Sequence, residues 1–249
     1  MPTLEYKAGV FALTAICGLV DVACFLALGG VFAELMTGNL LLMGITIGGG
    51  AFTWARVAVY LSAIVPFCVG ALIAGIMANG KYRFAVRVIG YPVEFAAVLL
   101  ATILAVILNP TKLILAGQFQ AADGYVWQRM TIVGLLAFGM GIHNALMRKH
   151  GVPDIATNVL TLTLTGLFSE SHLAGGPATH WKRRLGSILI FVGGAIAGAW
   201  LLQFGVAAPL IAATAIFAVA LLPLMKGRSK DAPATTTAFV PGPPDARAP

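Results

Sequence analysis

Charged side chains are scarce in this sequence. Asp, Glu, Lys and Arg make up 10% of its 249 residues, whereas a soluble domain carries about 25%. So few charges cannot cover the surface of a folded core, which excludes an ordinary soluble globular domain. Hydrophobic residues instead make up 59% of the chain, and the mean hydropathy is +0.92. The solvent around most of the chain is therefore lipid.

The sequence also lacks the motifs of common enzymes and metal sites. It has no Gly-rich phosphate loop, no HExxH and no GxSxG, so we expect a chain that is not an enzyme. Its three cysteines, Cys17, Cys24 and Cys68, lie in apolar segments without CxxC spacing, which favours packing over a disulfide or a metal. We expect no metal and no cofactor. The basic residues are split among short loops, so we expect no nucleic-acid partner either.

Eight apolar stretches follow one another along the chain, and most reach the ~20 residues that a helix needs to cross hydrocarbon. They lie at 8–28, 31–50, 54–79, 88–108, 126–147, 155–168, 185–204 and 206–225. The chain is thus predicted to be an all-α, polytopic transmembrane helical bundle, with residues 1–225 as its transmembrane domain. The start does not have the pattern of a signal peptide. Residues 226–249, rich in Pro, Ala and Thr, are predicted to be a disordered C-terminal tail.

The sequence repeats itself once. The residues GLVD that begin at Gly18 match the residues GIHN that begin at Gly141, and segment 69–75 matches segment 192–198 at the same spacing. Between these matches the alignment drifts by one residue. The repeats are predicted at about 8–108 and 126–225, each with four apolar segments. Membrane transporters are often built from two such halves.

The number of full spans depends on the second segment of each half. If this segment dips into the membrane and returns, only Arg56, Lys112 and Arg129 lie outside, a distribution that the positive-inside rule favours. Three spans per half would also make the two repeats inverted. We therefore expect six spans, a broken or re-entrant second helix in each half, and a bacterial inner (plasma) membrane location with both termini cytoplasmic. Eight full spans are the alternative.

Asp21 lies inside the first apolar segment. An ionised carboxylate at the centre of a span costs about 3 kcal/mol even on the most lenient scale, and such acids are functional by default. A proton- or cation-coupling role is therefore favoured over hydrogen bonding between helices or capping of the broken segment. Its repeat partner, Asn144, is neutral, so only the first half carries a titratable group at this position.

The stretch Thr37-Gly38-Asn39 has the composition of a helix break. Glycine relaxes the backbone, and Thr and Asn side chains can bond the backbone groups that a break frees. Such breaks survive at membrane depth only where protein or water lines them. The alternative is a capped loop between two helices. In the second half, Thr157, Asn158 and Thr161 form either a polar cavity wall or hydrogen bonds between helices.

Three other ionisable residues in apolar sequence are given ordinary roles. Glu34 could belong to the site, but an N-terminal helix cap near an interface is favoured, and Glu94 is expected to begin a helix behind Pro92. His143 could relay protons, but packing in the bundle is favoured.

Two stretches carry a family resemblance. GLVDVACFLALGGVFAELMTGNLLLMG is similar to the signature of the YoaK-like bacterial integral membrane proteins, a domain of unknown function, and GMGIHNALMRKHGVPDIATNVLTLTLTG resembles that family's later Thr-rich stretch. The resemblance covers about 8–225 and implies the fold without an activity. Leu162 follows Thr161 where the family more often has Gly, which weakens the case for two equivalent breaks. The implied family positions are Gly18, Asp21, Thr37, Gly38, Asn39, Gly141, Asn144 and Thr161.

The favoured function is a secondary transporter or permease for a small polar solute or ion, coupled to protons or a cation through Asp21. The expected binding residues are Asp21, Thr37, Gly38, Asn39, Asn144, Thr157, Asn158 and Thr161. The alternative is a non-transporting membrane scaffold or partner-binding protein, in which these polar groups only hold helices together. Besides the lipid bilayer and the solute, a homo-oligomer is left open.

Overall fold

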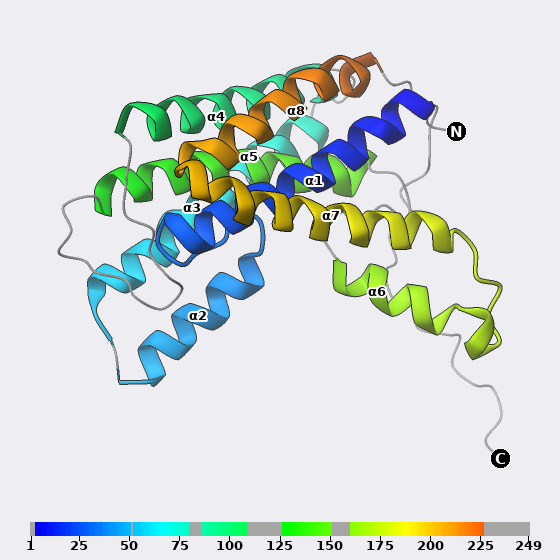
Figure 1. The fold of residues 1–249 in the computed structure, drawn as a ribbon, viewed down its shortest axis with the longest axis horizontal. Helices are drawn as coiled ribbons and strands as arrows, with labels where there is room; N and C mark the ends of the chain where they lie inside the picture. Colours follow the sequence, from blue (N-terminus) through cyan, green and yellow to red (C-terminus); the bar gives the residue numbers. More distant parts are fainter. Residues whose placement is uncertain (1–2, 51, 80–85, 109–125, 151–159, 227–249) are drawn as a thin grey trace.

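The chain folds into a bundle of α-helices (Figure 1). The computed structural model describes residues 3–50, 52–79, 86–108, 126–150 and 160–226. Its long helices are α1 (Leu4–Ala27), α3 (Trp54–Asn79), α4 (Val86–Leu108), α5 (Val126–His150), α7 (Trp181–Leu201) and α8 (Ala207–Lys226). Its short helices are α2 (Met36–Gly48), α6 (Leu160–Ser169) and the 3-10 turns at His172–Ala174 and Leu202–Phe204.

The all-α prediction is confirmed, since the described ranges contain helices and no strand. Within the described ranges, six helices are long and apolar enough to cross a membrane, namely the six long ones, with the last turn of α7 extended to Phe204. The second apolar segment of each half, expected at 31–50 and 155–168, contains only a short helix, α2 or α6. The predicted tail falls on residues 227–249, outside the described ranges, apart from its first residue, Lys226, which ends α8.

The centre of the bundle is formed by α1 and α5. In α1 and α5, 67% and 61% of the most apolar window is buried, against 22–39% in the other four long helices. Helix α1 packs against α7 and α8, while α5 packs against α3 and α4. Helices α4 and α8 also contact each other. The outward faces of α3, α4, α7 and α8 carry exposed aliphatic side chains, which suits contact with lipid.

Glycines bring two pairs of helices into backbone contact. Where α1 meets α7, a Cβ on Gly18 would clash with the carbonyl oxygen of Phe191. Where α5 meets α3, a Cβ on Gly141 would clash with the carbonyl oxygen of Phe67. Small residues at such crossings allow the close approach that stabilises helix pairs in membranes. The repeat-matched glycines of the sequence therefore serve the same purpose in two different helix pairs.

The chain direction of each helix follows from its contacts. Gly9, early in α1, packs against Leu224, late in α8, so these helices are antiparallel. Thr102, late in α4, donates a hydrogen bond to the carbonyl oxygen of Leu210, early in α8, over 3.2 Å, so these are antiparallel as well. Helices α1 and α4 consequently run in the same direction. Helix α5 is antiparallel to α4, so it runs in the same direction as α8.

The two short helices lie on the same side of the bundle (Figure 1). Each begins near the middle of the bundle's long axis, and the two run towards opposite ends (Figure 1). Helix α2 packs against α3, and α6 packs against α7. The start of α2 therefore brings the polar Thr37-Gly38-Asn39 stretch to mid-bundle depth.

Candidate functional site

Asp21 binds the connector between α1 and α2. After α1, Gly29 and Gly30 take positive φ angles of 126° and 73°, a conformation that favours glycine, and reverse the chain. The connector then returns to α1, where the Oδ1 atom of Asp21 accepts hydrogen bonds from the backbone N–H groups of Ala33 and Glu34, both over 2.8 Å. Asp21 is only 3% exposed, and its Oδ2 atom has no hydrogen-bond partner among the described residues. One carboxylate oxygen of Asp21 thus fixes the connector, and the other is available to accept a further hydrogen bond or to bind a proton or a cation.

Asn39 holds the same connector from the α2 side. Its Oδ1 atom accepts a hydrogen bond from the N–H group of Phe32 over 2.8 Å, and its Nδ2 atom donates to the carbonyl oxygen of Phe32 over 2.7 Å. The side chain is fully buried. The break lies earlier than predicted, between α1 and α2, because Thr37, Gly38 and Asn39 belong to the first turn of α2. Asn39 still bonds backbone groups that the break leaves free.

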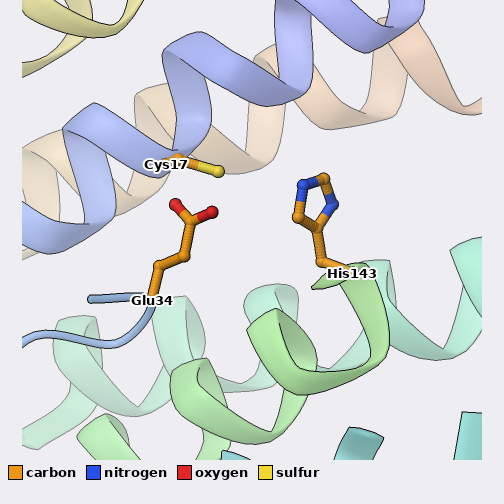
Figure 2. Close-up of side chains that lie close together, drawn as sticks. All are labelled: Cys17, Glu34 and His143. Carbon is orange, nitrogen blue, oxygen red and sulfur yellow. The ribbon is translucent and has the colours of Figure 1, made fainter. Parts of the chain in front are cut away.

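Glu34 is buried by this arrangement. It is 7% exposed, and neither of its carboxylate oxygens has a hydrogen-bond partner within the described part of the chain. The prediction that Glu34 caps a helix near an interface is wrong: the N-cap of α2 is Leu35, which makes no side-chain cap bond. The Glu34 carboxylate instead faces Cys17 of α1 and His143 of α5 (Figure 2). The ligand atoms of these three residues all lie within 4.8 Å of one another.

Glu94 completes the group from α4. Its Oε1 atom lies 3.1 Å from the Nδ1 atom of His143, and both side chains are fully buried. The prediction that Glu94 begins a helix is wrong, because α4 begins at Val86 and continues through Pro92. His143, for which packing was favoured, has an acidic partner instead. We call Cys17, Asp21, Glu34, Glu94, His143 and Asn144 the buried cluster.

The other residues expected from the sequence are distributed unevenly. Asn144 lies beside the Glu34 carboxylate, and its Nδ2 atom donates to the carbonyl oxygen of Met140 over 2.9 Å. Thr37 is exposed, and Gly38 packs against the ring of Phe32. Thr161 lies on an exposed face of α6, which packs against α7, so the structure does not bring it to the buried cluster. The remaining two expected residues, at positions 157 and 158, fall outside the described ranges.

The buried cluster brings together three carboxyl groups and one imidazole. Removing an ionised carboxylate from water costs several kcal/mol unless hydrogen bonds or an opposite charge compensate. Here one oxygen of Asp21 accepts two hydrogen bonds and Glu94 has His143 beside it, but the Glu34 carboxylate has no hydrogen-bond partner among the described residues. Three negative charges cannot be balanced by one imidazolium. The cluster can therefore remain buried only if it holds protons or a cation.

Sequence reasoning favoured ordinary structural roles over a site role for four members of the cluster, Cys17, Glu34, Glu94 and His143. The two acids lie within predicted apolar stretches, just as Asp21 does. The criterion that selected Asp21, a carboxylate inside a span, would therefore have selected them as well. For Cys17 and His143 the sequence contains no such signal, because they meet only through the packing of α1 near α5.

Comparison with known proteins identifies the family. The model of a family described as "Protein of unknown function (DUF1275)" matches residues 9–222. The chain belongs to the DUF1275 family. A relative is the UPF0700 transmembrane protein YoaK of Bacillus subtilis (strain 168), which is 30% identical over 173 residues that cover 68% of this chain and 69% of that protein. No solved structure matches the chain significantly.

Membership of DUF1275 confirms the YoaK-like resemblance that the two sequence stretches carry. A transmembrane relative and six apolar helices make this chain an integral membrane protein in contact with the lipid bilayer.

The Asn39 contacts of this DUF1275 chain can be tested directly. We expect Asn39→Ala to lower the free energy of unfolding by about 2–3 kcal/mol, because it leaves the N–H and C=O groups of Phe32 without their partner in a buried place. Thr37→Ala, at an exposed position two residues earlier, should change it by less than about 0.5 kcal/mol. Unfolding of the purified variants by SDS in detergent micelles measures the difference. Equal stabilities of the two variants would contradict the role given to Asn39.

Proposed function

We propose that this DUF1275 chain is a secondary transporter or permease for a small polar solute, coupled to protons or a cation that the buried cluster holds. The observation that carries the proposal is the meeting of Asp21, Glu34, Glu94 and His143 away from solvent in the interior of the bundle. A stable scaffold does not need three buried acids, because apolar side chains of similar volume usually serve as well or better. Intramembrane acids are typical of ion and proton pathways.

The matching contacts of two glycines support a two-repeat architecture, which is common in transporters. Gly18 in α1 and Gly141 in α5 make equivalent close contacts, with the backbones of α7 and α3. The contacted residues, Phe67 and Phe191, lie one residue further apart in the sequence than Gly18 and Gly141 do. This difference agrees with the one-residue drift in the alignment of the sequence repeat. In our proposal α1 to α4 and α5 to α8 are thus the two halves, and the cluster lies between them.

The chain directions favour inverted halves. Helices α1 and α4 run the same way, which requires an odd number of membrane crossings between the end of α1 and the start of α4. With α3 as one crossing and the loops on either side, this leaves α2 as a segment that enters and returns. The same argument applies to α6, because α5 and α8 run the same way. We propose six spans, two re-entrant segments, and both termini on the cytoplasmic side of the inner membrane.

We assign different roles to the three acids of the buried cluster. We assign to Asp21 the positioning of the connector, because its Oδ1 atom already accepts two backbone hydrogen bonds. Neither carboxylate oxygen of Glu34 has a hydrogen-bond partner in the described ranges, and Glu94 has His143 beside it, so these carboxyl groups are the better candidates to take up and release the coupling proton or cation. The solute would bind near the start of α2, whose N–H groups point a partial positive charge towards mid-bundle depth.

The proposal is tested by solute-dependent proton movement. Purified protein is reconstituted into vesicles that contain a pH-sensitive dye, and a panel of amino acids, sugars, polyols, nucleosides and short carboxylates is added outside under an inward proton gradient. We expect at least one class of solute to accelerate acidification of the wild-type vesicles. Glu34→Gln should reduce this flux at least tenfold, whereas Glu5→Gln, at an exposed acid near the start of α1, should leave it unchanged.

The opposite results favour the alternative function. If no solute moves protons faster than in protein-free vesicles, or if Glu34→Gln transports as well as wild type, the polar cluster does not couple transport. The chain would then be better described as a membrane scaffold or a partner-binding protein.

A further inference from the structure

We infer that Cys17, Glu34 and His143 form a binding site for one divalent transition-metal ion of the zinc class. The three residues come from α1, from the connector after α1, and from α5. Their ligand atoms lie within 4.8 Å of one another, and all three side chains are buried. In Figure 2 the Cys17 sulfur, the Glu34 carboxylate and the His143 ring face one another across a small gap. The inference deepens the proposed function, because it rests on the same buried cluster and names the cation.

The orientation of His143 favours a metal over a simple ion pair. Its Nδ1 atom lies 3.1 Å from Glu94, so its Nε2 atom is the nitrogen left for Cys17 and Glu34. Nε2 has no hydrogen-bond partner among the described residues, although it is fully buried. A histidine that ligates a metal commonly presents its other nitrogen to a carboxylate, which fixes the ring and raises its basicity. Glu94 is placed to do this.

The geometry needs only a small adjustment. Zinc-class ions hold sulfur, nitrogen and oxygen ligands at about 2.0–2.3 Å, which places neighbouring ligand atoms about 3.5 Å apart. The ligand atoms of Cys17, Glu34 and His143 are already within 4.8 Å of one another. Side-chain rotations that move these atoms by about 1 Å would therefore bring them to the distances that a zinc-class ion needs. The connector that carries Glu34 is held by Asp21, so one of the ligands is positioned in advance. Three protein ligands leave a fourth position open for water or a solute atom.

The donor set selects the ion. Thiolate and imidazole prefer zinc, cobalt and nickel, whereas magnesium and calcium prefer oxygen ligands alone. A divalent ion would also balance the charges of its own two anionic ligands, the thiolate of Cys17 and the carboxylate of Glu34, while Asp21 and Glu94 would still depend on protons or hydrogen bonds. The sequence suggested no metal site, because its three ligands are widely separated along the chain and share no recognised spacing.

The test uses cobalt(II) as a spectroscopic probe of the full-length protein in detergent, without an affinity tag. The background carries Cys68→Ser, because Cys68 is an exposed cysteine that could bind metal by itself. We expect one cobalt ion per chain, with the intense near-ultraviolet band of a cobalt–thiolate bond. Zinc should displace cobalt, and magnesium at the same concentration should not. Cys17→Ser, Glu34→Gln and His143→Gln should each weaken binding at least 100-fold.

Two further variants keep the test decisive. Cys24→Ser, at another buried cysteine of α1, should bind cobalt as the background does. Glu94→Gln retains all three ligands and should weaken binding about 10- to 100-fold, as loss of a carboxylate behind a ligating histidine typically does. A cobalt–thiolate band that persists in Cys17→Ser, or no saturable binding by the folded background protein, would overturn the inference. Cobalt binding is measured without transport. The metal-site inference can therefore fail while solute-driven proton movement is observed, and the transport proposal can fail while cobalt binds.

Discussion

Gly194→Ala and Gly141→Ala are each expected to lower the free energy of unfolding by about 3 kcal/mol, at the upper end of the usual cost of overpacking. The reason is the identity of the contacted atoms: an added Cβ would clash with the carbonyl oxygen of Ala15 in one case and of Phe67 in the other. A backbone atom cannot rotate away as a side chain can, so two helices must separate. Heat or SDS unfolding in detergent measures the loss, which corresponds to about 6–12 °C in Tm.

Gly193→Ala is the matched control. It lies next to Gly194 on α7, but no atom of the described chain is within 4 Å of a Cβ added there. We expect its stability to stay within about 1 kcal/mol of wild type, since alanine also has the higher helix propensity. If both neighbouring variants melted alike, close backbone contact between α1 and α7 would not be what holds this crossing together.

Asp21→Ala is expected to cost about 2–6 kcal/mol, because it leaves the N–H groups of Ala33 and Glu34 buried without an acceptor and each such group costs about 1–3 kcal/mol. Asp21→Asn retains an oxygen that can accept both hydrogen bonds, so it should cost only about 1 kcal/mol. SDS unfolding of the two variants beside wild type gives the comparison.

The pair of Asp21 variants also separates two roles. If Asn replaces Asp21 with little loss of stability and with transport retained, Asp21 positions the connector and the coupling proton or cation resides elsewhere in the cluster. If Asp21→Asn is as damaging as Asp21→Ala, its negative charge rather than its hydrogen-bonding oxygen is required, and Asp21 itself belongs among the coupling groups.

The bundle could largely be predicted from the sequence, because a long apolar run has few alternatives to a membrane helix. Six of the eight apolar stretches became long helices close to their expected bounds. The GLVD and GIHN matches also pointed to real structural positions, since Gly18 and Gly141 lie at close crossings. Hydropathy does not reveal that residues 31–35 of the second apolar stretch form a non-helical connector, in which the N–H groups of Ala33 and Glu34 bond with Asp21.

The candidate site could be predicted only in part. Asp21, Asn39 and Asn144 stand out as polar residues in apolar sequence, and the structure places all three at or beside the connector. The partnership of Glu94 with His143 depends on how α4 packs against α5, which no local pattern encodes. Thr161 was expected from its repeat position opposite Thr37, but a repeat predicts equivalent backbone positions rather than a shared site.

The acids of the buried cluster all belong to the first half of the chain, whereas the second half contributes His143 and the neutral Asn144. In a protein of two inverted halves, exchange of conformation between the halves converts the state open to one side into the state open to the other. Two identical halves would make these states equal in energy. If the chain is the inverted-repeat transporter proposed above, the confinement of the acids to one half would make protonation or ion binding stabilise the two states unequally. The molecule would then have a resting orientation, and the ion load of the cluster would determine how strongly it is held there.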